Sequence, residues 1–331
     1  MKNVWFMQHQ ILAWFQKNGR VLPWRVRDAR QLHGDITRDA AMLSYMDSTK
    51  GRDPYVILVS ELMLQQTQVD RVLPKYLDFM QRWPTITALS KATLTEVLIA
   101  WKGLGYNRRA KHLLETAIII EHEYKGVFPQ DEVLLVKLPG IGTYTARAIL
   151  AFAYNKPVAV TDTNIKRIFA RFVYGCEFSD LKISMQEFEK NAESAIPESM
   201  ADPWYQALMD FGALICVSQP KCEICPLQKQ CAAYKKAVQL GQTSYKSVLQ
   251  LTKVPSGKKK IPFKETDRYL RGRIIDTLRE QPYHMEDLQR MSREKWGLTT
   301  SSRDLKRWGS LIEDLKTEGL IQITGSTVSL S

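Results

Sequence analysis

Helical periodicity over residues 54–215 constrains the fold more than any other feature of the sequence. Apolar residues recur there at spacings of three and four, the spacing of one helix face, as in Ile57, Leu58, Leu62, Leu64, Val69, Val72, Leu73, Tyr76, Leu77 and Met80. Glycines and prolines divide the run into short helices, and alternating β-branched segments are nearly absent. The sequence therefore predicts a mainly α fold over this region.

Two segments depart from this pattern. Residues 26–52 are polar and charged without a clear period, and we interpret them as an insertion with at most one short helix. After a basic linker at 238–265, residues 266–331 predict three amphipathic helices. The apolar residues of the third are Leu305, Trp308, Leu311, Ile312 and Leu315. A terminal segment at 320–330 alternates around Gly325-Ser326, which is typical of a β-hairpin. We expect a catalytic domain at 1–237, with a cysteine loop at 216–231, and a small winged-helix-like α+β domain at 266–331.

The charge of the chain favours a polyanionic partner. Lys and Arg number 47 and Asp and Glu 35, a net charge of +12. Nucleic acid is the commonest partner of such a chain, although a soluble basic protein without this function would have the same balance. The first residues lack the apolar core of a secretory signal, and no apolar run approaches the ~20 residues that span a bilayer. We expect a cytoplasmic, nucleoid-associated protein.

Four of the five cysteines, Cys216, Cys222, Cys225 and Cys231, lie close together with the spacing Cys-x5-Cys-x2-Cys-x5-Cys. In a reducing compartment such a group more often holds metal than forms disulfides. Four thiolates can bind one zinc ion or one iron–sulfur cluster, and on the residues alone zinc is the commoner choice. Cys176 is left over and is expected to be a buried thiol.

A glycine-bearing hairpin is expected at Leu138-Pro139-Gly140-Ile141-Gly142-Thr143, between two helices. Small residues let the backbone approach a phosphate, and the next helix offers free N–H groups to it. Such an interaction is independent of DNA sequence. A plain helix–helix turn would also use glycine, so the hairpin alone does not decide between the two.

Two acidic residues could carry chemistry. Asp162 lies between an apolar run and a new helix, where a helix N-cap would explain it fully. Glu61 lies on a helix with apolar neighbours on both sides. Desolvation there would raise its pKa, as a general acid requires, although a solvated helical glutamate is the more common case.

Taken in order, these motifs resemble the helix-hairpin-helix DNA glycosylases. Within them they resemble the A/G-specific adenine glycosylase (MutY) family, in the short actinobacterial-type form without a Nudix-like domain. The resemblance covers residues 1–25 and 53–231 and is carried by Ser60–Val69, Trp101–Tyr106, Leu138–Gly142, Asp162–Asn164 and the four cysteines. It implies two helical subdomains that bind double-stranded DNA and flip a mispaired adenine out of the helix.

The resemblance also implies roles for individual residues. Glu61 would protonate adenine, and Asp162 would stabilise the oxocarbenium ion of the sugar, with support from Tyr144 and Asn164. The four cysteines would hold a 4Fe–4S cluster, which replaces zinc as the expected cofactor. Gln66 and Thr67 would enter the DNA helix beside 8-oxoguanine, and Tyr106 would wedge into the base stack. The other implied DNA-contacting residues are Gln65, Gly140, Gly142 and Thr143 of the hairpin, and Trp24 and Arg25 at the edge of the adenine pocket.

Three departures from the family pattern leave open questions. The first cysteine spacer has five residues where the family usually has six, the 26–52 insertion adjoins the pocket edge, and the Nudix-like domain is missing. We expect a monomeric, monofunctional enzyme of base excision repair that acts on adenine opposite 8-oxoguanine or guanine. The alternatives are a bifunctional lyase, which carries lysine where this chain has Tyr144, a glycosylase for another base such as thymine opposite guanine, and an iron–sulfur DNA-binding regulator.

Overall fold

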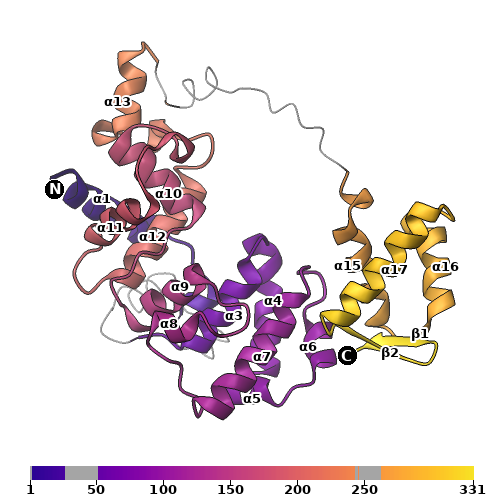
Figure 1. Cartoon of the computed structure of the whole chain (residues 1–331). Helices are drawn as coiled ribbons and strands as arrows, with labels where there is room; N and C mark the ends of the chain where they lie inside the picture. Colours follow the sequence, from indigo (N-terminus) through magenta and orange to yellow (C-terminus); the bar gives the residue numbers. More distant parts are fainter. Residues whose placement is uncertain (1, 27–50, 243–244, 246–261) are drawn as a thin grey trace. The chain divides into compact units, whose positions relative to one another are not determined.

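The computed structural model describes residues 2–26, 51–242, 245 and 262–331. The expected insertion and most of the expected linker lie outside these residues. The chain forms two compact units (Figure 1). Unit 1 comprises Met1–Leu58, Gln130–Lys137 and Ile141–Ser256, and unit 2 comprises Val59–Pro129, Leu138–Gly140 and Gly257–Ser331. The boundary between them falls inside helix α3 (Pro54–Leu64). The expected division at residues 237 and 266 stays a prediction.

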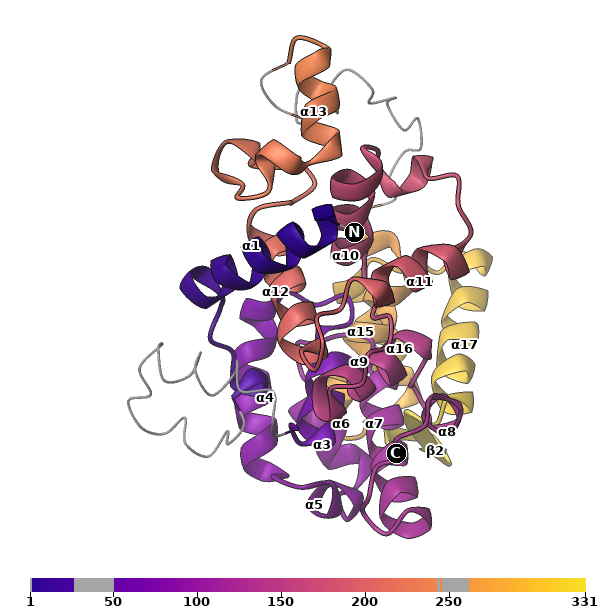
Figure 2. The same ribbon diagram turned by 90° about the vertical axis from the view of Figure 1, so that its left-hand side faces the viewer.

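Unit 1 is built around helix α12 (Ala201–Leu214), which packs against α1, α9 and α10. Its buried side chains include Trp204, Tyr205 and Phe211. Figure 2 shows α12 together with the helices that surround it. The other α-helices described wholly within this unit are α1 (Lys2–Asn18), α8 (Glu132–Leu135), α9 (Thr143–Tyr154), α10 (Thr163–Phe169), α11 (Met185–Ser194) and α13 (Ala232–Gln239). Short 3-10 helices lie at η1 (Pro23–Arg25), η4 (Phe178–Asp180), η5 (Cys222–Ile224) and η6 (Gln228–Gln230).

A π-helical turn, η3 (Ala170–Tyr174), continues α10 and packs against α13. It ends at Gly175, whose φ is 69°. A side chain at this position would be strained by the left-handed backbone, and its Cβ would lie 3.3 Å from Ala232. Glycine therefore lets the turn pass close to the start of α13.

The first part of unit 2 is a helical bundle in which α7 (Arg108–Glu123) packs against α5 (Ile86–Ser90) and α6 (Leu94–Ala100). Helix α4 (Val69–Arg82) buries Val72, Tyr76 and Phe79. Leu77, which the periodicity placed on the same apolar face, is 45% exposed. The apolar stripe of α4 is therefore narrower than the sequence pattern indicated.

The last part of unit 2 contains three helices, α15 (Asp267–Leu278), α16 (Met285–Trp296) and α17 (Ser302–Thr317). A three-stranded antiparallel sheet of order β1-β3-β2 accompanies them, with β1 at Tyr283–His284, β2 at Ile321–Thr324 and β3 at Thr327–Leu330. The register pairs Ile321 with Leu330 and Thr324 with Thr327. The expected helices and terminal hairpin are confirmed, whereas Leu305, expected on the apolar face of α17, is 43% exposed.

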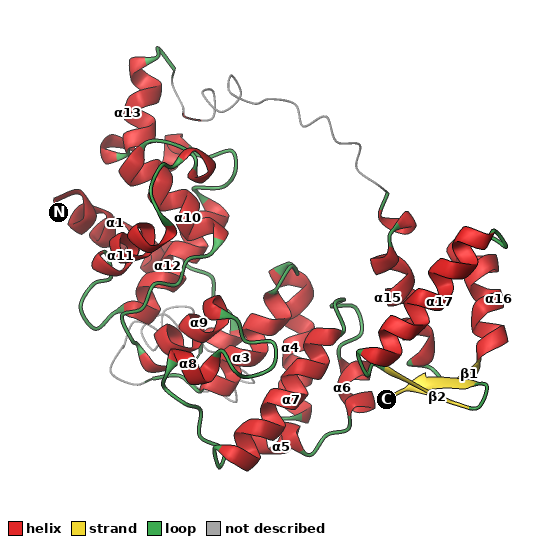
Figure 3. Cartoon of the chain, in the orientation of Figure 1, coloured by secondary structure: helices red, strands yellow, loops and turns green. Residues whose placement is uncertain are grey.

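The expected mainly α fold is confirmed. Figure 3 shows the strands confined to the C-terminal part, and among the described residues none precedes Tyr283. The part of the chain that the structure describes contains no helix that is both long and apolar enough to cross a membrane.

Candidate active site

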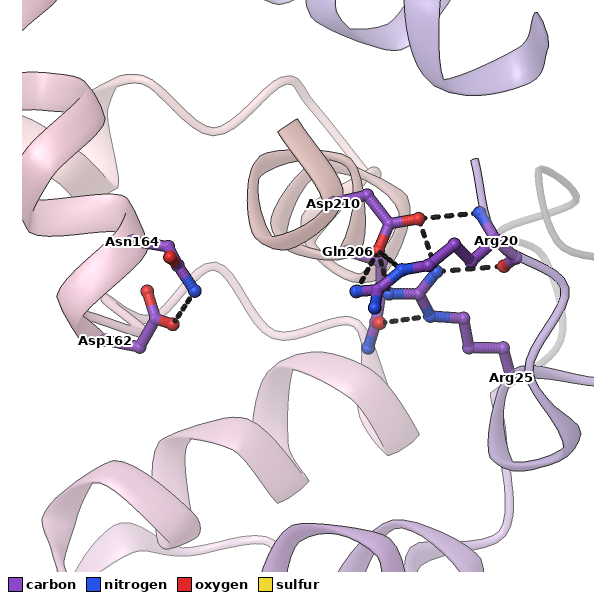
Figure 4. A network of polar contacts seen from close by, with 6 residues as sticks. All are labelled: Arg20, Arg25, Asp162, Asn164, Gln206 and Asp210. Atoms are coloured by element: carbon purple, nitrogen blue, oxygen red, sulfur yellow. Dashed lines mark hydrogen bonds and ion pairs between the residues drawn. The ribbon is translucent and has the colours of Figure 1, made fainter. Parts of the chain in front are cut away.

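Asp162 is the N-cap of α10, as the sequence suggested. One carboxylate oxygen accepts a hydrogen bond of 2.7 Å from the Ile165 amide, and the other accepts one of 2.9 Å from Asn164 Nδ2 (Figure 4). Burial raises the pKa of Asp162, and the hydrogen bonds from Ile165 and Asn164 work in the opposite direction. Capping therefore uses one oxygen, and the second is held in place by a side-chain amide.

Asn164 is in turn fixed by Arg167, a residue to which the sequence analysis gave no role. Arg167 Nη2 donates to Asn164 Oδ1 and to the carbonyl of Gly212, both at 2.7 Å, and its Nε donates to the carbonyl of Cys216 at 2.7 Å. The spacing of three between Asn164 and Arg167 places them on one helix face and could have indicated this interaction. A continuous chain of hydrogen bonds thus leads from Asp162 to the backbone of Cys216.

Gly212 allows the close packing behind Asn164. A Cβ at this position would lie 2.5 Å from the Cβ of Asn164, far inside van der Waals distance. Any side chain on α12 at this point would displace Asn164. The sequence analysis missed this residue as well, because the packing joins two helices far apart in the chain.

The four cysteines follow α12 on one loop, with Cys222 in a short 3-10 helix, η5 (Cys222–Ile224), and Cys231 directly before α13. Burial raises the pKa of Cys216, that of Cys225 to about 12 and that of Cys231 to about 11. Among the described residues no three or more His, Cys, Asp or Glu side chains form a ready site for a single metal ion. Four thiols on one short loop are nonetheless the donor set that zinc and iron–sulfur clusters require.

Arg171 anchors the start of this loop. Its Nη1 lies 3.7 Å from Cys216 Sγ and donates to the carbonyl of Val217 at 2.6 Å, and its Nη2 donates to the carbonyl of Ser218 at 2.9 Å. Its Nε pairs with Glu177 at 2.7 Å. Arg171 therefore attaches the loop to η3.

Arg25 and Arg20 share the carboxylate of Asp210, as Figure 4 shows. Arg25 donates from Nη1 and Nη2 to the two oxygens of Asp210 at 2.9 and 2.8 Å, and from Nε to Gln206 Oε1 at 2.8 Å. Arg20 donates to Asp210 from its amide at 2.7 Å and from Nη2 at 2.7 Å. Burial opposes ionisation of Asp210, but the two arginines outweigh it and hold its pKa below the usual range.

This network holds the side chain of Arg25 against α12, the helix that carries Asp210. The Asp210 side chain has no exposed surface, and that of Arg25 is 5% exposed. Trp24 is buried beside it in η1. In the sequence, both residues come just before residues 27–50. Their expected role at the edge of the adenine pocket stays a prediction.

The remaining expected catalytic residues lie on helices. Tyr144 is the second residue of α9 in unit 1, and Glu61 is on α3 in the part assigned to unit 2, next to the buried Leu62. Both are partly buried. Glu61 thus lies on a helix beside an apolar neighbour, as the sequence indicated, and its role stays a prediction.

The expected helix-hairpin-helix is present, with α8 and α9 joined through Gly140 and Gly142. Gly140 has a φ of 74°, and a Cβ on it would lie 2.8 Å from that of His112. Gly142 is the N-cap of α9 and provides no side-chain cap. Gly142 and Thr143 are exposed, so the first amides of α9 are open to an anion.

Two loops of unit 2 present Gln66 and Tyr106. Both residues have a left-handed backbone, with φ of 55° and 48°, and the Tyr106 hydroxyl donates to Gln66 Oε1. Thr67 Oγ1 is 3.2 Å from the carbonyl of Gln65 and 3.4 Å from that of Leu104. The structure thus brings together the residues that were expected to enter the DNA helix.

Arg109 holds these two loops together from beneath and was not foreseen. Its guanidinium donates to five carbonyl oxygens, those of Leu62, Met63, Gln65, Leu104 and Gly105. Burial lowers the pKa of Arg109 to about 10, so the group is still charged at neutral pH. A single buried cation therefore joins the loop of Gln66 to the loop of Tyr106.

Comparison with known proteins matches residues 59–194 to the HhH-GPD superfamily base excision DNA repair proteins. The adenine DNA glycosylase of Mycolicibacterium smegmatis is 37% identical over 272 residues, which are 82% of this chain and 80% of that protein. That of Mycobacterium tuberculosis is 36% identical over 298 residues, 89% of this chain and 84% of the relative. A solved thermostable thymine-DNA glycosylase superposes with a TM-score of 0.59 and 29% identity, over 71% of this chain and 98% of its own.

Proposed function

Because the chain belongs to the adenine DNA glycosylase family of base excision repair proteins, we propose that it hydrolyses the N-glycosidic bond of adenine mispaired with 8-oxoguanine or guanine. The observation that carries the proposal is the arrangement of Asp162, whose second oxygen is held by Asn164 while the first caps α10. A carboxylate fixed in this way is suited to stabilise positive charge on a sugar ring.

Glu61 is proposed as the general acid. Adenine is a poor leaving group until its ring is protonated, and a carboxyl group among apolar neighbours retains its proton at higher pH than usual. Asp162 must do the opposite and remain ionised. Burial raises the pKa of Asp162, and the hydrogen bonds from Ile165 and Asn164 limit that rise. The two acids are proposed to take different tasks, with Asp162 as the ionised group. Tyr144 is proposed to support Asp162 from α9.

The enzyme is proposed to be monofunctional. A lyase needs an amine that forms a Schiff base with the abasic sugar, and Tyr144 has none. Strand cleavage should therefore appear only after alkali or heat. Borohydride trapping of a protein–DNA adduct as efficient as base release would contradict this assignment.

Cys216, Cys222, Cys225 and Cys231 are proposed to hold a 4Fe–4S cluster. The donor set fits, since four thiols lie on one loop that Arg171 attaches to η3. When bound, the cluster would crosslink this loop. Purified protein should contain iron, and Cys222→Ser should lose iron together with DNA affinity. Stoichiometric zinc after anaerobic purification would contradict the proposal.

The proposed partner is double-stranded DNA with a mispaired adenine, bound by a monomer. The exposed amides at the start of α9 suit a phosphate, and the exposed Tyr106 and Gln66 suit entry into the base stack. The proposed DNA-binding residues are those expected from the sequence, namely Gln65, Gln66, Thr67, Tyr106, Gly140, Gly142, Thr143, Trp24 and Arg25.

A second candidate is excision of thymine opposite guanine, favoured by the similarity to the solved thymine-DNA glycosylase. Base release should be measured under single turnover on duplexes with adenine opposite 8-oxoguanine, adenine opposite guanine, and thymine opposite guanine. We expect release of adenine only, and in Glu61→Gln a loss of ~10²-fold or more with DNA binding retained. Thymine release would favour the second candidate, and near-normal rates in Glu61→Gln would reject its role as the acid.

A further inference from the structure

A cavity of about 890 Å³ lies within unit 2, between residues 65–71 and 103–112 on one side and the C-terminal residues 263–279 and 315–320 on the other. We call it the arginine cavity. Seven arginines and two acidic residues line it, which gives 7 − 2 = +5 for these side chains. A concave surface with such an excess of one charge concentrates ions of the opposite sign.

Four of these arginines have no acidic partner among the described residues. Arg271 pairs with Glu318 and Arg279 with Asp276, and Arg109 is used by backbone carbonyls. No carboxylate in the described ranges pairs with the others, which are Arg71, Arg108, Arg268 and Arg273, and all four are exposed. Exposed guanidinium groups around one cavity are suited to several phosphates.

The cavity also offers planar surfaces for stacking. The Arg268 guanidinium lies between two aromatic rings, 5.0 Å from the centre of Tyr106 and 5.2 Å from that of Phe263. Arg109 lies 5.5 Å from the centre of the Tyr106 ring. Tyr106 is 37% exposed and Phe263 54% exposed, so both keep ring surface available. Bases removed from their stack bind to such aromatic and arginine planes.

The two walls of the cavity are joined by several hydrogen bonds. Arg279 donates from Nε to the carbonyl of Leu98 at 2.8 Å and from Nη2 to Asn107 Oδ1 at 2.7 Å. Thr95 Oγ1 donates to the carbonyl of Ser331 at 2.7 Å. Arg268 also donates to the Tyr106 hydroxyl. The C-terminal helices are therefore part of the surface that carries Tyr106.

We propose that the arginine cavity binds a DNA strand in which one nucleotide is unstacked. Arg71, Arg108 and Arg273 would bind the phosphates, and the base would lie on the ring faces of Tyr106 and Phe263 next to Arg268. The inference rests on the proposed function only in assuming that the bound strand belongs to the duplex that carries the mispaired adenine. It makes the C-terminal residues 263–279 and 315–320 a DNA-binding wall.

The proposed binding of phosphates by the arginines is tested by the salt dependence of binding to plain duplex DNA. This measurement does not require base excision, so its outcome is separate from that of the proposed function. The double variant Arg71→Ala, Arg273→Ala should lower the slope of log K against log salt by ~2, at ~0.9 for each phosphate that the protein no longer neutralises. Arg293→Ala, an exposed arginine on α16 outside the cavity, is the matched control and should leave the slope unchanged. Equal slopes for the double variant and the control would overturn the inference.

The stacking is tested with 2-aminopurine placed as an unpaired base in either strand of a duplex. The wild-type protein should quench its fluorescence in one of the two strands, which identifies the strand that is bound. Phe263→Ala and Arg268→Lys should relieve the quenching, because lysine retains the charge but not the plane. The salt slope of Arg268→Lys should equal that of wild type. Absence of quenching in both strands, or quenching unchanged in both variants, would overturn the inference.

Discussion

Replacing Asp210 by asparagine is expected to destabilise unit 1 strongly. The Asp210 side chain has no exposed surface and binds Arg25, which is 5% exposed, and Arg20, which is 31% exposed. Removing one partner of a buried ion pair leaves a buried charge without compensation and costs about 3–5 kcal/mol. This is a large share of a total free energy of unfolding of about 5–15 kcal/mol. With a urea slope of about 2–3 kcal/mol per molar, the midpoint should fall by about 1–2.5 M.

The assay is urea denaturation followed by circular dichroism, with Glu187→Gln as control. Glu187 is an exposed acid on α11 of the same unit, and its loss should cost less than about 0.5 kcal/mol. A loss for Asp210→Asn no larger than that of the control would refute the reasoning.

The pH dependence gives a second check on Asp210. Because the two arginines hold the pKa of Asp210 below its ordinary 3.8 in the folded state, the ionised carboxylate contributes stability above that value. This contribution is lost as the pH falls through the lower folded value. The difference in unfolding free energy between wild type and Asp210→Asn should be constant from about pH 8 to about pH 5 and shrink below about pH 4. A difference that instead grows towards acid pH would contradict the ion-pair explanation.

Three further predictions concern residues around the site. Asn164→Ala removes a hydrogen bond that lowers the pKa of Asp162. The acidic limb of the pH profile of the single-turnover rate should therefore move to higher pH. An acidic limb at unchanged pH would reject the assignment of Asp162 as the ionised group. Gly212→Ala should lower the free energy of unfolding by about 1–3 kcal/mol through overpacking and slow base release, because the new methyl group would contact Asn164. Unchanged thermal melting and activity would show that α12 shifts to make room for the methyl group. Arg109→Met should lower the free energy of unfolding by about 2–4 kcal/mol, because buried carbonyl oxygens lose their donor and water replaces only part of that loss. It should also reduce base release more than binding of plain duplex, and equal losses in both assays would show that Arg109 does not act through the loop of Tyr106.

Local signals explain why the helices and the terminal hairpin could be predicted. Asp162, Ser184, Thr266 and Ser301 each cap a helix through a side-chain oxygen, and such residues are strongly preferred at that position. The hairpin is likewise set by neighbouring residues, since Gly325 has a φ of 60° in the turn between β2 and β3. A capping residue or a turn glycine lies within a few residues of the helix end or turn that it determines, so a short stretch of sequence is enough to predict it.

The interactions that organise the site could not be predicted in the same way. Arg109 binds carbonyl oxygens up to 47 residues away, and Arg25 binds Asp210, 185 residues away. A carbonyl has no sequence signature, and a charged residue in a helix is usually exposed. Leu305 shows the converse, because periodicity identifies the apolar face of α17 but not its width, and this leucine is exposed at the edge.

The attachment of two loops through Arg109 has a consequence for how this enzyme can change. Five of the six acceptors of its charged donors are main-chain oxygens, and the sixth is the Thr67 hydroxyl at 3.4 Å. Every amino acid supplies the same carbonyl. Substitutions at Gln66 or Tyr106 therefore alter the surface proposed to meet DNA without removing a hydrogen-bond acceptor of Arg109. The contacts of Arg109 with the main chain therefore tolerate substitution of these two exposed residues. Selection can change the side chains proposed to contact the bases while Arg109 continues to hold the two loops together.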